Sequence, residues 1–420
     1  MKYGLISVLA LALACGCSKK PAASANEAEP ESRTTAGAAS TQGAPPPDFD
    51  ALLAREATAL AATEVKGPAG AFTARVSSKG TPQTALVEGV AVVEIPIGAE
   101  TPVRCQVFPD DVDPGGTLAG LFDDARKKVE FRRMIPWSVT AIDGAPAAFV
   151  RALYLAPGPR GKSMGELKTM VHGFPGHGVL CLHDELGYEK TFTTVATEFG
   201  QSLAFPGAKR REPQLIDIQQ VSLQGLAVGF ARRELVSDAG KRSDVMNGFV
   251  MLPVSEAELR FSDYYEVQQF DTSGHLATGV WVEASNGQLD LKVKVDHTKD
   301  GDYTYAGEAK GKPVSGAFTT KDKKPLPGSL SMARALAPHA RDAKPFSVEQ
   351  LEYSPELDLA APTPVRYSRE AGDAASSVRI TKPKSAATAM LDEHGLFEKS
   401  SIPLGASTME ISRVFVRGKP

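Results

Sequence analysis

The residue types best suited to chemistry gather in one short segment, 172–185. It contains three of the seven histidines of the chain, together with Cys181 and Asp184. If the strands on either side of its Gly/Pro turn form a hairpin, His172 and His183 approach across it, and His183 shares a face with Cys181. Neutral imidazoles with a carboxylate, with or without a thiolate, suit zinc or copper. The spacing fits no standard metal motif, so the alternative is a histidine-containing turn beside a disulfide or a buried thiol.

Two cysteines outside the N-terminal region, Cys105 and Cys181, each lie in an apolar, strand-like run. Each alternates with valine, which places both side chains on an apolar face of a strand. In an oxidising compartment the two can pair, and the chain-entropy model gives such a disulfide about 4 kcal/mol. Two buried thiols, the usual state of free cysteine, are the alternative.

Catalytic motifs are scarce elsewhere. The sequence has no Ser-x-x-Lys, His-Glu-x-x-His or Gly-x-Gly-x-x-Gly string. A Ser/His/Asp set is recognised by geometry rather than by sequence position, so an unrecognised hydrolase stays an alternative. We expect no cofactor, and the overall expectation leans toward a protein that is not an enzyme.

The N-terminus indicates where these residues work. A basic start is followed by the apolar run 5–14 and by the string Cys-Gly-Cys-Ser, which is the order of a secretory signal. With a cysteine at the cleavage point, residues 1–17 resemble a bacterial lipoprotein signal. The resemblance implies acylation of Cys17, with Cys15 as the alternative, and anchoring of the chain to a lipid bilayer. Because Ser18 replaces the aspartate of inner-membrane retention, it also implies sorting to the outer membrane of the cell envelope.

Charge and hydropathy exclude some partners. The formal net charge of −3 favours neither nucleic acid nor an anionic membrane surface. No apolar run after the signal is long enough to span a bilayer. Attachment to a membrane is therefore expected through lipid alone.

Composition and periodicity divide the rest of the chain. Residues 18–47 are rich in Ala, Ser, Glu, Pro and Thr and predict a disordered tether. Strand patterns followed by helical ones predict an α+β sandwich domain over 48–206, with helices covering one antiparallel sheet. Within it, the Val- and Ile-rich stretch 86–97 suits a central strand. A linker at 207–214 precedes a β-rich domain over 215–420, in which serial hairpins build a curved antiparallel sheet.

Two further resemblances are weaker. The order of elements in the first domain is loosely similar to PsbP-like domains. The second domain resembles β-rich domains found beside transglutaminase-like domains, on the strings Leu391-Asp-x-x-Gly395 and Pro403-Leu-Gly405, and is similar to the half-barrels of lipoprotein carriers. The second of these resemblances implies a curved sheet, and neither implies a particular reaction.

Together these patterns predict a tethered envelope lipoprotein with a non-catalytic binding or structural role. A curved sheet would offer an apolar concave face to a lipid, a peptide or a partner protein. A metal-binding protein that uses His172, His183 and Cys181 or Asp184 is the first alternative. The unrecognised hydrolase is the second.

Overall fold

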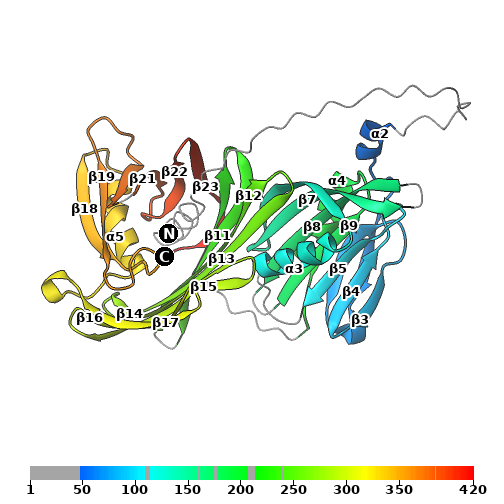
Figure 1. Cartoon of the computed structure of the whole chain (residues 1–420). Helices are drawn as coiled ribbons and strands as arrows, with labels where there is room; N and C mark the ends of the chain where they lie inside the picture. Colours follow the sequence, from blue (N-terminus) through cyan, green and yellow to red (C-terminus); the bar gives the residue numbers. More distant parts are fainter. Residues whose placement is uncertain are drawn as a thin grey trace, which may run out of the picture.

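The structure is a computed structural model that describes residues 48–108, 114–158, 161–174, 177–206, 213–238, 241–383 and 385–420. The predicted signal peptide with Cys15 and Cys17, the predicted tether, and most of the predicted linker lie outside these residues. Figure 1 shows the described part as two strand-rich halves that lie side by side.

The first half contains a two-stranded and a seven-stranded antiparallel sheet. The larger sheet has the strand order β3-β4-β5-β9-β8-β7-β6, and β1 pairs with β2 alone. The elements are α2 (Phe49–Leu53), β1 (Ala61–Lys66), η1 (Pro68–Gly70), β2 (Thr73–Ser78), β3 (Gln83–Val87), β4 (Val90–Ile95), β5 (Val103–Phe108), α3 (Pro114–Arg126), β6 (Glu130–Ile142), β7 (Ala145–Gly158), β8 (Gly161–Phe174), β9 (His177–Asp184) and α4 (Glu189–Ser202).

The predicted α+β sandwich, with its helices on one face of a sheet, is wrong. Helix α4 packs on one face of the seven-stranded sheet, where Phe192 meets Phe149. Helix α3 packs on the opposite face, where Phe122 joins a cluster with Val150. Consecutive residues of a strand point to opposite faces, and here both are apolar, so both faces need cover. The described chain is mostly strand, in three antiparallel sheets.

The stretch 86–97 is likewise not one strand: it supplies the end of the edge strand β3 and the whole of β4, which lies inside the sheet between β3 and β5. It contains a tight turn at Glu88 and Gly89, which have φ values of 51° and 82°. The turn joins β3 to β4, and β3 forms an edge of the sheet. A Val- and Ile-rich run shows only a preference for strand, whereas the turn requires backbone angles that glycine adopts readily.

The second half is a single fourteen-stranded antiparallel sheet with the order β17-β16-β15-β14-β13-β12-β11-β10-β23-β22-β21-β20-β19-β18. Its elements are β10 (Leu215–Leu223), β11 (Leu226–Asp238), β12 (Lys241–Ser255), β13 (Glu258–Phe270), β14 (Leu276–Ser285), β15 (Gln288–Lys299), β16 (Asp302–Ala309), β17 (Lys312–Thr319), η2 (Lys321–Lys323), α5 (Ser329–Ala340), β18 (Phe346–Glu352), β19 (Thr363–Arg369), β20 (Ser377–Lys382), β21 (Ser385–Leu391), β22 (Phe397–Leu404) and β23 (Ser407–Gly418).

The chain enters this sheet in its middle. It steps outward by hairpins from β10 to β17, crosses through α5 to the opposite edge at β18, and returns by hairpins to β23, which pairs with β10. Figure 1 shows the sheet curving around α5. We call the face toward α5 the inner face.

Two turns of this sheet use the same device. The Asp271 carboxylate accepts hydrogen bonds from the backbone N–H of residues 273 and 275, and Gly274 has a φ of 85°. The Asp392 carboxylate accepts from residues 394 and 396, and Gly395 has a φ of 74°. Aspartate thus opens each turn and glycine supplies the left-handed residue.

Helix α5 fills the inner face of the sheet. Met332 and Leu336 are buried in one cluster with inner-face residues of strands on both sides of the helix, such as Val250 and Ile380. On the β14–β17 side a second cluster buries Trp281 against Tyr353, with ring centroids 5.3 Å apart. The inner face is therefore a packed core along most of its length.

The two halves share a third cluster. Phe122 of α3 stacks on Phe261 of β13 with ring centroids 5.9 Å apart, and the backbone N–H of Gly115 donates to the Asp263 carboxylate at 3.0 Å. A Cβ atom on Gly115 would lie 1.8 Å from that carboxylate, so any larger residue there would displace it. Among the described helices, none combines the length and the apolar character needed to cross a bilayer.

Candidate functional site

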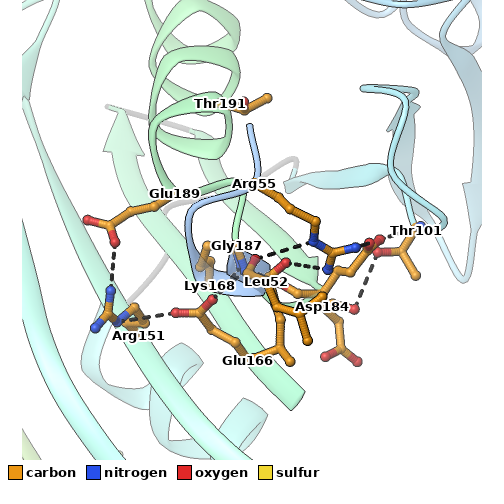
Figure 2. Close-up of polar contacts among 12 residues, drawn as sticks. Leu52, Arg55, Thr101, Arg151, Glu166, Lys168, Asp184, Gly187, Glu189 and Thr191 are labelled. Atoms are coloured by element: carbon orange, nitrogen blue, oxygen red, sulfur yellow. Dashed lines mark hydrogen bonds and ion pairs between the residues drawn. The ribbon is translucent and has the colours of Figure 1, made fainter. Parts of the chain in front are cut away.

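The predicted segment 172–185 borders a buried ionic cluster, which lies where the end of β9 pairs with the middle of β8 (Figure 2). At its centre Lys168 and Glu166 are both buried, with exposed side-chain fractions of 0% and 1%. The Lys168 ammonium donates to the Glu166 carboxylate at 3.2 Å and to the backbone carbonyl of Glu185 at 2.5 Å. Burial lowers the pKa of Lys168, and the attraction of Glu166 opposes that change.

Glu166 joins the lysine to two further elements. Its carboxylate accepts from the backbone N–H of Gly187 at 3.1 Å and lies 3.3 Å from the Arg151 guanidinium. The same guanidinium pairs with Glu189, at the start of α4, at 2.6 Å. One buried carboxylate therefore holds β7, β8 and the turn before α4 together (Figure 2).

The segment after α2 covers this cluster. Arg55 donates to the backbone carbonyl of Leu186 at 2.7 Å and pairs with the Glu185 carboxylate at 3.2 Å. Gly187, with a φ of 79°, lies so close beneath the segment that a Cβ there would be 2.5 Å from the carbonyl oxygen of Leu52. The left-handed backbone and the close contact together require glycine.

The N-terminus of α4 is also occupied by the chain itself. The Glu56 carboxylate accepts hydrogen bonds from the backbone N–H groups of Lys190 at 2.9 Å and of Thr191 at 2.8 Å. A carboxylate at this position satisfies free helix amides and complements the helix dipole. The polar groups of the cluster are thus arranged to hold elements together, which is a structural role.

His183 lies beside this cluster on β9. It pairs in register with Lys168, is almost fully buried, and packs its ring against Tyr188 with centroids 5.6 Å apart. Burial, and then the nearby Lys168 ammonium, lower the pKa of His183 to about 3. The imidazole is therefore neutral at physiological pH.

The structure does not bring His172 to His183. His172 pairs with Val179, four residues along β9 from His183, a separation of roughly 13 Å at the usual rise of a strand. Its Nδ1 atom lies 2.8 Å from the backbone carbonyl of Pro146. Asp184 points to the other face and accepts a hydrogen bond from the Tyr154 hydroxyl. Within the described ranges, no group of three histidine, cysteine or acidic side chains could hold a metal ion.

The sulfur atoms of Cys105 and Cys181 form a disulfide. The two residues are register partners on β5 and β9, and 76 positions separate them in sequence. Both lie in the core beneath α4. The sequence leaves open a disulfide or two buried thiols, and the structure has the disulfide.

A Gly-x-Ser-x-Gly string occurs at 161–165. The string lies at the start of β8. In hydrolases with this motif the serine occupies a sharp turn from a strand into a helix. Here Ser163 pairs with Ala156 across a β-hairpin, so its surroundings are not those of such a nucleophile.

A second polar network crosses the inner face of the large sheet. Arg233 donates to both oxygens of the Asp244 carboxylate, at 2.9 and 2.7 Å, and to the Ser329 hydroxyl at the start of α5. Arg413 of β23 pairs with Asp217 at 3.0 Å and with Asp392 at 2.8 Å. These ion pairs tie α5 and the Asp392 turn to the middle of the sheet.

Further along the inner face, carboxylates accumulate. Burial raises the pKa of Glu266 well above its usual range, and the Asp244 carboxylate raises it further. Burial and the nearby Glu356 carboxylate raise the pKa of Glu283 to about 8, and burial raises that of Glu356 to about 7. Lys382, 3.6 Å from Glu352, supplies a nearby positive charge. This region holds protonated acids near neutral pH.

Neither network is visible in the sequence. Lys168 and Glu166 are two residues apart, which predicts only that they share a face of a strand. Burial of that face follows from α4 and the α2 segment, which come from distant parts of the chain. The sequence hints at the buried pair only through the alternation of charged and apolar residues in 164–170. A strand that faces solvent would show the same alternation.

Comparisons with known proteins give no family. No family model matches the chain, and no curated protein matches it. A β-barrel-like protein of the domain of unknown function DUF1849 from Brucella abortus is 13% identical, over 49% of this chain and 98% of that one, with a TM-score of 0.37. A DUF1089 family protein from Pseudomonas aeruginosa is 14% identical, over 47% and 94%, with a TM-score of 0.20. At these TM-scores neither similarity carries an argument about this chain.

Proposed function

We propose that this chain is a lipid-anchored protein of the bacterial cell envelope with a non-catalytic role in binding partner proteins. The lipoprotein-like signal supports the anchor. Packing of the inner face supports a protein partner over an apolar ligand, because α5 buries the surface that a ligand would need. Leu336 of α5 has an exposed fraction of 0%, and the inner-face residues Val365 and Ile380 have exposed fractions of 0% and 3%.

The polar clusters of the described residues support the proposal that the role is non-catalytic. Lys168, Glu166 and Arg151 bind one another and the backbone, and Arg233 and Asp244 do the same on the large sheet. A general acid or base has to reach a substrate, whereas all of these side chains except the partly exposed Arg151 are buried. Screening the purified chain against esterase and peptidase substrates checks this part, and turnover that Ser163→Ala abolishes would contradict it.

The binding role is tested on the full chain in cells. Chemical crosslinking followed by affinity purification is expected to recover the same envelope proteins from wild type and from a Ser163→Ala control. Native mass spectrometry of the same preparation examines the alternative. A lipid bound at one equivalent per chain, with no crosslinked protein, would contradict a protein partner and favour an apolar ligand.

A further inference from the structure

One part of the inner face of the large sheet is polar. Tyr264, Glu266 and Gln268 of β13 are all buried, and Tyr264 packs in the same cluster as Met332 of α5. Alternate residues of a strand share a face, and so do register partners on neighbouring strands. Because Glu283 of β14 is the register partner of Tyr264, all four of these strand side chains lie on the inner face. Glu266 and Glu283 are diagonal neighbours there.

Three oxygen atoms of these side chains accept no hydrogen bond from any described residue: Oε2 of Glu266, Oε1 of Gln268 and Oε1 of Glu283. Glu266 and Gln268 are 2% and 1% exposed, and the Gln268 amide donates to the other oxygen of Glu266 at 2.5 Å. Native proteins rarely leave several buried polar atoms unpaired at one place. With the carboxyl groups ionised all three atoms are acceptors, so a partner for them must supply several donors.

The charge of the surroundings favours a cation as that partner. Burial raises the pKa of Glu266 and of Glu283, and the carboxylate of Glu356, in the turn after β18, also raises both. Lys382 acts on Glu356, but it lies 3.6 Å from the Glu352 carboxylate and offsets that charge first. The carboxyl groups of Glu266, Glu283 and Glu356 therefore carry an excess of negative charge when they ionise. We call these three groups the acidic cluster.

The charged groups on the neighbouring strands do not neutralise the acidic cluster. Asp244 of β12, which acts on Glu266, is itself bound by Arg233. Asp290 of β15 adds a further negative charge near Glu283. A bound cation would thus meet attraction from both sides of the inner face.

We propose that the acidic cluster binds the ammonium group of a small primary amine. An ammonium group carries one positive charge and three N–H donors, which match the excess carboxylates and the unpaired acceptors. Glu283 and Glu356 are only partly buried, so the cluster can be reached from solvent. A metal ion fits less well, because no three acidic, histidine or cysteine side chains in the described part of the chain are placed to hold one. This inference goes beyond the proposed envelope role and does not depend on the lipid anchor.

Calorimetric titration of the purified full-length chain tests the site, with butylammonium as the probe and butanol as its neutral control. At pH 8 butylammonium is expected to bind at one equivalent, at least tenfold more tightly than butanol. Glu283→Gln is expected to weaken that binding at least tenfold, whereas Glu308→Gln, at an exposed position of β16, leaves it unchanged. Circular dichroism verifies that both variants fold. Butylammonium binding no tighter than that of butanol, or unchanged in folded Glu283→Gln, would overturn the proposal.

The pH dependence of binding supplies a second readout. Burial, and then the Glu356 carboxylate, raise the pKa of Glu283 to about 8, so this carboxyl is protonated at pH 6 and has to release its proton to pair with an ammonium group. Butylammonium is therefore expected to bind at least tenfold more weakly at pH 6 than at pH 8, and less of this change should remain in Glu283→Gln. Equal affinity at the two pH values would contradict the proposal. Calcium that binds more tightly than butylammonium would also contradict it and would assign the carboxyl groups to a metal.

Discussion

The two large sheets bury ionisable groups in different ways. In the seven-stranded sheet Lys168, Glu166 and Arg151 are matched by opposite charges and by backbone groups. The fourteen-stranded sheet has matched pairs near α5, but it also buries Glu266 and Glu283 among other carboxylates. The difference predicts that the stability of the first sheet depends on intact ion pairs. The stability of the second sheet depends instead on buried carboxyl groups that stay protonated.

The disulfide is expected to have the largest effect, and only the first sheet has one. Replacing Cys105 and Cys181 together by serine removes a crosslink that closes a 76-residue separation. The chain-entropy model gives a loss of about 4 kcal/mol. Urea unfolding of the oxidised wild type and of the double variant measures it. A loss below about 1 kcal/mol would indicate that the crosslink hardly constrains the unfolded chain.

Matched substitutions of two buried glutamates compare the sheets directly. Glu166→Gln leaves the Lys168 ammonium without its carboxylate and is expected to cost about 3 kcal/mol. Glu266→Gln replaces a protonated acid by an amide of similar shape and is expected to cost less than about 1 kcal/mol. Both are measured by urea unfolding at pH 7. Equal costs would show that the two sheets do not differ in this way.

His183 predicts acid sensitivity in the first sheet. Its folded pKa of about 3 lies below the ordinary 6.5, so the unfolded chain binds the proton more readily. Stability is therefore lost as the pH falls below 6.5, by about 2 kcal/mol at pH 5. His183→Gln should remove this part of the pH dependence. Urea midpoints of both proteins between pH 5 and 7 measure it, and parallel curves would contradict the prediction.

The carboxylates predict the opposite sensitivity in the second sheet. The folded pKa values of Glu283 and Glu356, about 8 and about 7, exceed the ordinary 4.5. The folded chain then holds protons that the unfolded chain has released, so stability falls as the pH rises from 4.5 through these values. Between pH 7 and 8, Glu283→Gln is expected to reduce this loss by about 1 kcal/mol. Melting temperatures that fall equally in both proteins would count against it.

Local patterns predicted local features well. Alternation and turn residues indicated many of the strands, and the Asp271 and Asp392 turns form as their sequences require. The arrangement of layers was not predicted, because Phe149 and Val150 show apolar character on both faces of a strand without showing what covers each face. The buried cluster was missed for the same reason, since burial of Lys168 depends on α4 and on Arg55, far away in the sequence. The turn at Glu88 was overlooked because it interrupts an apolar run.

The lipid anchor is the part of the proposed function that one measurement tests most directly. Cells that produce wild type, Cys17→Ala or Cys15→Ala are labelled with a palmitate analogue, and membranes are separated from soluble protein. We expect label and membrane retention for wild type and Cys15→Ala, and neither for Cys17→Ala. Unlabelled wild-type chain, or a labelled Cys17→Ala variant that stays with the membranes, would contradict the proposal.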